Sequence, residues 1–221
     1  MNKSVYSIVL ADEVVDAIDR MAYSMNTSRS NLINQILAER VSLQTPEMRM
    51  RGIFSAIQQL ADPRFQFLAQ PSDAMISLKS PIRYKYKPTL RYSIELSRNF
   101  GGKVGRLKVQ FRTQSTQLIS AAESFFDIWY KIESKYLAKL FTKGVPAKAA
   151  DGKYVRDFYS PAADELSDDQ IAAAIVEYIQ LTDKCVQLYF DGLSQGMQEI
   201  ENTAQIEKNY AAYLKKGVPV L

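Results

Sequence analysis

Residues 3–10, KSVYSIVL, and residues 12–43, DEVVDAIDRMAYSMNTSRSNLINQILAERVSL, decide the fold of the first part of this chain. In the first stretch, larger apolar residues alternate with smaller ones, and a period of two is typical of a β-strand. A strand with one apolar face is therefore predicted. That face carries Tyr6, Ile8 and Leu10, and the other face carries Val5, Ser7 and Val9.

Two amphipathic helices are predicted in the second stretch, because apolar residues recur there at every third or fourth position. The pattern lapses at SMNTSRSN, residues 24–31. Asn26 can adopt the left-handed conformation that ends a helix, and Ser28 can cap the helix that follows. The first apolar stripe is Val14, Val15, Ile18, Met21, Ala22 and Met25, and the second is Leu32, Ile33, Ile36, Leu37 and Val41.

This strand-helix-helix unit is incomplete on its own. A single strand leaves its backbone N–H and C=O groups unpaired, so it needs a second strand beside it. If the second strand is the same segment of another copy, the two form a twofold antiparallel ribbon with four helices on its apolar face. The opposite face of such a ribbon can enter the major groove of DNA.

In the order strand, helix, MNTSRSNL turn, helix, residues 3–43 resemble the ribbon-helix-helix family of bacterial and phage DNA-binding regulators. The resemblance implies a homodimer or higher oligomer that binds double-stranded DNA, with a transcriptional repressor of bacterial, plasmid or phage origin as the expected function. It covers about the first fifth of the chain. Residues 46–221 carry no such resemblance.

The resemblance also implies two sets of DNA contacts. The outward side chains of the strand would touch base edges, and the start of the second helix would hold phosphate. The second assignment also follows from physics, because the free N–H groups and the dipole of a helix N-terminus attract anions. The expected base contacts are Lys3, Val5, Ser7 and Val9, and the expected phosphate contacts are Ser28, Arg29 and Ser30.

Two other functions remain open on the sequence. Antitoxins of the resembling family join a DNA-binding module to a second part that binds a partner protein, so residues 46–221 could bind a protein or nucleic acid here. An assembly protein that uses the ribbon only to dimerise is the other alternative, because valines on the outward face offer DNA only apolar contacts.

Composition limits the classes of protein that the chain can belong to. At 221 residues and 47% hydrophobic content, it can form a small module, residues 1–45, and one larger domain, residues 46–221. No stretch has the roughly 20 apolar residues of a membrane span, and no signal-peptide core is visible, so a cytoplasmic protein without membrane contact is expected.

Catalytic, metal and cofactor sites are not predicted. The chain has no histidine and a single cysteine, so Ser-His-Asp and Cys-His chemistry and the usual zinc sites are excluded. Cys185 lies in an apolar helical pattern and is expected to be buried. Asp164, Asp168 and Asp169 are expected from the helix dipole at the start of a helix rather than as a catalytic group.

For residues 46–221 the patterns predict an α+β fold, mostly helical with a small antiparallel sheet. A helix is predicted at 47–61, and strands are predicted within about 74–113, including 83–87 and a hairpin of 89–97 with 106–112. Three helices are predicted from residue 115 onward, and the first of them, 115–141, is expected to pack against the hairpin. Residues 143–161 are predicted to form a loop.

Positive charge is concentrated in the middle of the chain, where residues 52–114 carry eleven basic and three acidic side chains. The predicted hairpin would place much of this charge on its outer face. Three interpretations stay open: a solvated face, a second nucleic-acid contact, and a docking surface for an acidic partner. The residues concerned are Arg83, Lys85, Lys87, Arg91, Arg106, Lys108 and Arg112.

Overall fold

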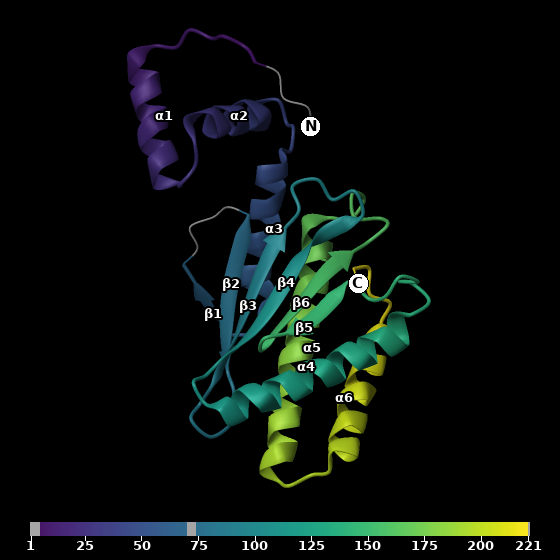
Figure 1. The fold of residues 1–221 in the computed structure, drawn as a ribbon. Helices are drawn as coiled ribbons and strands as arrows, with labels where there is room; N and C mark the ends of the chain where they lie inside the picture. Colours follow the sequence, from purple (N-terminus) through teal and green to yellow (C-terminus); the bar gives the residue numbers. More distant parts are fainter. Residues whose placement is uncertain (1–4, 70–73, 221) are drawn as a thin grey trace.

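A computed structural model describes residues 5–69 and 74–220 and confirms the predicted α+β class. Helices α1 (Asp12–Ser24) and α2 (Arg29–Arg40) stand apart from the rest of the chain and join it through α3 (Pro46–Leu60) (Figure 1). The remaining helices lie beside a six-stranded sheet. They are α4 (Thr116–Leu137), α5 (Asp168–Ser194) and α6 (Glu199–Leu214).

The turn between α1 and α2 is formed as the sequence predicts. Asn26 has a φ of 51°, which ends α1. Ser28 caps α2, since its hydroxyl oxygen accepts a hydrogen bond from the Asn31 N–H at 3.2 Å. The two helices bury a small cluster of their own, which consists of Ile18, Ala22 and Leu32 and is separate from the main core.

The predicted N-terminal strand is not formed. Residues 5–10 belong to no helix or strand, and the chain enters α1 directly from them. Lys3 and Ser4, where the predicted strand begins, lie outside the described residues. The physical reason is that a strand requires a hydrogen-bonded neighbour, and no strand among the described residues lies beside this segment.

The sheet is antiparallel throughout, in the order β1-β2-β3-β4-β6-β5. The predicted hairpin forms its centre, with Leu90 opposite Phe111 and Ile94 opposite Leu107. Its inward side chains are buried, as predicted, and its outward ones are half-buried or exposed. The strands are β1 (Gln66–Leu68), β2 (Met75–Pro81), β3 (Thr89–Leu96), β4 (Lys103–Arg112), β5 (Ala147–Ala150) and β6 (Lys153–Tyr159).

Two predictions about the strands are wrong. Residues 143–161 are not simply a loop, because β5 and β6 form a hairpin there and β6 pairs with β4. The alternation in β6 was obscured because the charged Arg156 occupies an inward position. Residues 83–87 are a turn between β2 and β3, in which Tyr86 and Lys87 have φ of 65° and 42° and cannot continue a strand.

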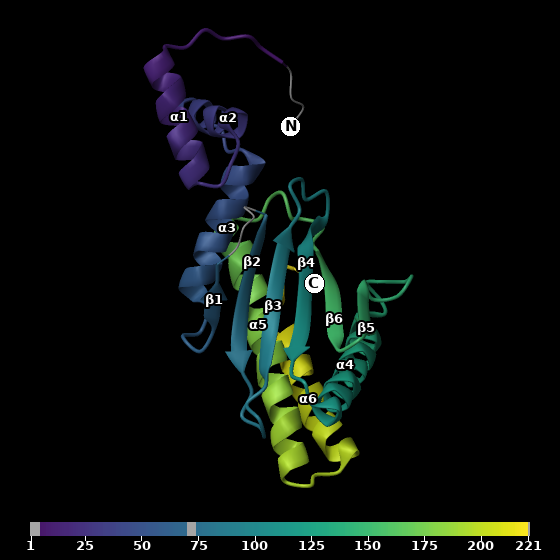
Figure 2. The same cartoon turned by 60° about the vertical axis from the view of Figure 1, so that its left-hand side comes forward.

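The helices of the main domain cover one face of the sheet and leave the other open (Figure 2). The helix that packs against the hairpin is α5 rather than the predicted α4. Phe190 of α5 stacks on Phe111 of β4 at 5.2 Å between ring centroids, whereas α4 packs at the β5–β6 side, where Phe126 stacks on Tyr154. Thus α5 is the central helix, and Cys185 within it is fully buried as expected.

A buried carboxylate joins α5 to the sheet. Asp183 of α5 is fully buried, and the Tyr92 hydroxyl of β3 donates a hydrogen bond to its Oδ1 at 3.0 Å. No hydrogen-bond partner for Oδ2 lies within the described ranges. Burial raises the pKa of Asp183, although the nearby Ser80 hydroxyl and the Tyr92 hydrogen bond offset part of this effect.

This raised pKa predicts that Asp183→Asn stabilises the protein at neutral pH. A carboxyl group whose pKa is higher in the folded than in the unfolded chain stabilises the fold most when it is protonated, and this contribution disappears as the pH rises. Urea unfolding at pH 7 should therefore give the variant a higher free energy of unfolding than wild type. The difference should disappear below about pH 4, the ordinary Asp pKa. A variant that is less stable at pH 7 would contradict the prediction.

Candidate nucleic-acid interface

The outward positions predicted to contact bases are solvent-exposed. Val5 is 99% and Val9 is 100% exposed, and Ser7 between them is exposed as well. Lys3 lies outside the described residues. The alternate side chains Tyr6 and Ile8, predicted to face a core, are also exposed in the single chain. Both faces of residues 5–10 are therefore exposed to solvent. Nothing in the described chain covers the face that carries Tyr6 and Ile8.

The helices behind this segment also leave apolar side chains uncovered. Of the two predicted stripes, Ile18, Ala22 and Leu32 are buried, whereas others are exposed to solvent. Residues 5–43 carry most of the large exposed hydrophobic side chains in the described part of the chain. We give the name uncovered apolar surface to those that belong to the predicted inward face of the strand and to the two helical stripes, which are Tyr6, Ile8, Leu10, Val14, Met21, Ile36, Leu37 and Val41.

The three positions predicted to contact phosphate lie together at the start of α2. Ser28, Arg29 and Ser30 are all exposed. The Ser28 side chain accepts from the Asn31 N–H, while the other N–H groups of the first turn stand at the positive end of the helix dipole. The arrangement can accept an oxyanion.

Arg29 has an internal partner that the sequence did not reveal. Its Nε donates a hydrogen bond to Asp19 Oδ1 at 2.6 Å, and its Nη2 donates to Asp19 Oδ2, so that the two side chains form a bidentate ion pair between α2 and α1. The hydrogen bond from Arg29 lowers the pKa of Asp19. Asp19 therefore competes with any phosphate for Arg29, whose Nη1 donors are not used in this pair.

The basic residues predicted in the middle of the chain fall into three places. Arg91, Lys108 and Arg112 lie on the open face of the sheet. Arg106 lies at the opposite end of that face, where its Nε donates to Asp157 Oδ1 at 2.6 Å. The last three, Arg83, Lys85 and Lys87, are exposed in the turn between β2 and β3, at the same end of the sheet as Arg112.

Three further cations on the open face were missed in the sequence. Lys79 of β2 is opposite Arg91, Lys153 of β6 is opposite Gln110, and Lys148 of β5 is opposite Val155. The alternation of residues 153–159 was the available signal for one of them, Lys153. It went unused because that segment was predicted to be a loop.

A buried polar cluster lies at the other face of the sheet, between β6 and helices α4, α5 and α6. The Glu133 carboxylate is fully buried and accepts hydrogen bonds from Tyr154, from Tyr178 at 3.0 Å and from Tyr210 at 3.2 Å, and it pairs with Arg156 at 3.2 Å. Burial raises the pKa of Tyr154 and of Tyr178 well above the usual tyrosine value. The polar groups of the cluster bond to one another inside the core, so the cluster has a structural role and connects β6 to α4, α5 and α6.

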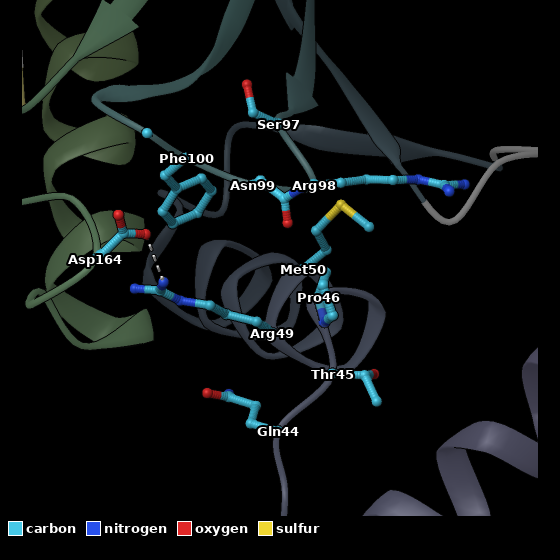
Figure 3. Close-up of a pocket in the computed structure, with 11 residues that line it drawn as sticks. Gln44, Thr45, Pro46, Arg49, Met50, Ser97, Arg98, Asn99, Phe100 and Asp164 are labelled. Atoms are coloured by element: carbon cyan, nitrogen blue, oxygen red, sulfur yellow. Dashed lines mark ion pairs between the residues drawn. The ribbon is translucent and has the colours of Figure 1, made fainter. Parts of the chain in front are cut away.

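A cavity of about 440 Å³ lies where the N-terminal helices meet the main domain. Its walls come from residues 44–50, from the β3–β4 turn at 97–101 and from Asp164 (Figure 3). Arg49 of α3 reaches across it, with its guanidinium 4.5 Å from the centre of the Phe100 ring. Its nitrogens donate to the backbone carbonyls of Ala163 and Leu166 and to the Asp168 carboxylate, so this arginine fastens α3 to the start of α5.

No family model, curated protein or solved structure matches this chain. Within residues 5–69 and 74–220, none of the helices has the length and apolar character needed to cross a membrane. In the same ranges no group of three or more Cys, Asp or Glu side chains is placed to hold a metal ion.

The Arg49 interactions predict that Arg49→Met destabilises the protein by about 2 to 3 kcal/mol, because methionine keeps an aliphatic stem but cannot make the charged hydrogen bonds or the cation–π interaction. Arg98→Met is the matched control. Arg98 lines the same cavity, is 66% exposed and lies 4.0 Å from Glu47, so its substitution should change the free energy of unfolding little. Equal effects of the two substitutions in urea unfolding would refute the role given to Arg49.

Proposed function

We propose that this chain is a homodimeric, sequence-dependent DNA-binding protein, and specifically a transcriptional repressor of the ribbon-helix-helix type. The observation that carries the proposal is the uncovered apolar surface of residues 5–43. The hydrophobic side chains buried in this region are Ile18, Ala22, Leu32 and Ala38. Much hydrophobic area is left in water, and burial of such area is the main favourable term in protein association.

A second copy is the occupant that fits this surface. Residues 5–10 have an alternating pattern and unpaired backbone groups, and the same segment of another copy supplies a strand of equal length and complementary pattern. Antiparallel pairing would place Ile8 and Leu10 of both copies over α1 and α2. It would turn Val5, Ser7 and Val9 outward, toward a DNA groove.

The start of α2 supports phosphate binding beside that ribbon. Its exposed N–H groups, the helix dipole and the Arg29 charge act on the same anion. Phosphate contacts of this kind position a protein on the duplex, while base-edge contacts select the sequence. In this chain the predicted base contacts are Lys3, Val5, Ser7 and Val9. The two valines offer only apolar contact, for example with thymine methyl groups, which leaves Lys3 and Ser7 for polar contacts.

The experiment that tests this function is selection of bound duplexes from a random pool, followed by footprinting of the enriched sequence at moderate salt. A protected site bound roughly a thousandfold or more tightly than unrelated DNA is expected for a specific regulator. If no sequence is enriched, or if protection does not exceed the nonspecific background, the proposal is wrong.

The Arg29–Asp19 pair gives a sharper prediction. Asp19→Asn should tighten binding to the selected duplex by about two- to fivefold, because the exposed carboxylate no longer competes with phosphate for Arg29. Arg29→Gln should weaken binding and lower the slope of log affinity against log salt by about 0.9 for each phosphate that Arg29 neutralises in the wild-type complex.

Glu39→Gln is the matched control, because it removes one exposed negative charge from α2 away from Arg29. It should change affinity less than Asp19→Asn does. Equal gains from the two acidic substitutions would mean that only net charge matters and would remove Arg29 from the interface.

A further inference from the structure

The open face of the sheet is divided by charge into two halves. At one end, Asp157 accepts hydrogen bonds from Lys103 at 2.8 Å and from Arg106 at 2.6 Å, and Glu95 lies directly opposite Arg106. Positive and negative charges are therefore balanced at that end.

The other half of the face is not balanced. Lys79 and Arg91 are directly opposite each other on β2 and β3, and like charges in this position destabilise a sheet. The Nε of Arg91 is buried without a hydrogen-bond partner among the described residues. Asp151, in the turn between β5 and β6, lies at this end, and Glu123 and Asp127 of α4 line a pocket with it and with Lys153. Among the described residues, the other five cations of this half (Lys79, Arg91, Lys108, Arg112 and Lys148) form no ion pair with a carboxylate. We call the cations of this half the basic half-face, which comprises Lys79, Arg91, Lys108, Arg112, Lys148 and Lys153.

The turn between β2 and β3 extends this surface. Arg83, Lys85 and Lys87 are exposed at the same end of the sheet as Arg112. In Figure 1 this end of the sheet lies away from α1 and α2. A ligand bound here would therefore lie apart from the DNA-binding positions proposed for residues 5–30.

We propose that the basic half-face binds the phosphate backbone of double-stranded DNA without reading its sequence. Six strands about 4.8 Å apart make a surface about 24 Å wide, whereas the major groove is about 12 Å wide. The face cannot enter a groove and can only lie across the phosphates. Such binding uses cations that are not already neutralised by acidic side chains. When these cations neutralise phosphates, the counterions held by the DNA are released, and this release favours binding.

The side chains between these cations favour duplex DNA over other anionic partners. Ser77, Ser93 and Gln110 occupy the neighbouring outward positions, where proteins that bind single strands present aromatic rings for base stacking. A protein interface usually has a large apolar or aromatic anchor at its centre. Between these cations the described sheet offers the small Val155, opposite Lys108 and Lys148, and no aromatic ring. Ser77 is itself buried and accepts a hydrogen bond from Arg91 Nη2 at 3.5 Å. Lys108, Arg112 and Lys148 are exposed and accessible to phosphate oxygens.

The test measures the salt dependence of binding by the full chain to a short duplex of arbitrary sequence. The face variant is Lys108→Gln, Arg112→Gln and Lys148→Gln combined, since all three side chains are exposed. It should lower the slope of log affinity against log salt by roughly 2 to 3, because each substituted cation that neutralises a phosphate accounts for about 0.9. The control variant combines Lys131→Gln, Lys139→Gln and Lys143→Gln, three exposed lysines outside the sheet, and should leave the slope near that of wild type.

Two further measurements separate this inference from the proposed function. Arg29→Gln should leave most of the binding to the arbitrary duplex in place, because the half-face does not depend on α2. If the face and control variants have equal slopes while Arg29→Gln abolishes binding, the inference fails and the proposed function stands. Polyglutamate at the same charge concentration should compete poorly with the duplex. If it competes equally well, the face attracts any polyanion and the inference is overturned.

Discussion

The six-stranded sheet is covered by helices on one face only, and this constraint determines how the rest of the main domain is organised. Antiparallel pairing places Leu90, Ile94 and Leu107 on the covered face. The hydrophobic effect therefore draws α5 to the centre of that face, and α4 and α6 pack beside it. The opposite face has to be compatible with water, and it carries the charged side chains of the same strands.

Polar groups inside this core fix the positions of the helices as well as filling space. Asp183 joins α5 to β3 through Tyr92, and Glu133 joins α4 to β6, α5 and α6. A buried carboxylate is costly unless it is hydrogen-bonded, so each of these groups favours one arrangement of its neighbours. At the junction with the N-terminal helices, Arg49 has a similar role with backbone carbonyls as its partners. Residues 5–43 have no comparable connection to the described core, and their apolar surface remains uncovered.

Local patterns predicted local structure well and long-range pairing poorly. The turn at Asn26 and Ser28, the hairpin of β3 and β4 and the burial of Cys185 follow from a few neighbouring residues and were predictable. The β5–β6 hairpin was missed because Arg156 interrupts the apolar alternation, and its burial depends on Glu133, which is 23 residues away in the sequence. The pairing of Arg29 with Asp19 depends on how α1 and α2 cross. The spacing of apolar residues along each helix does not predict that crossing. The strand predicted at residues 3–10 would need a neighbouring strand, and none of the described strands lies beside residues 5–10.

Sedimentation equilibrium of the full chain tests whether a second copy covers residues 5–43. The wild-type protein should sediment at about twice its chain mass of 25.1 kDa. Ile8→Asp, on the predicted inward face of the ribbon, should sediment as a monomer, whereas Val9→Asp, one residue further on the outward face, should remain a dimer. A wild-type protein that stays monomeric at micromolar concentration, or the same mass for both variants, would contradict a dimer built on this ribbon.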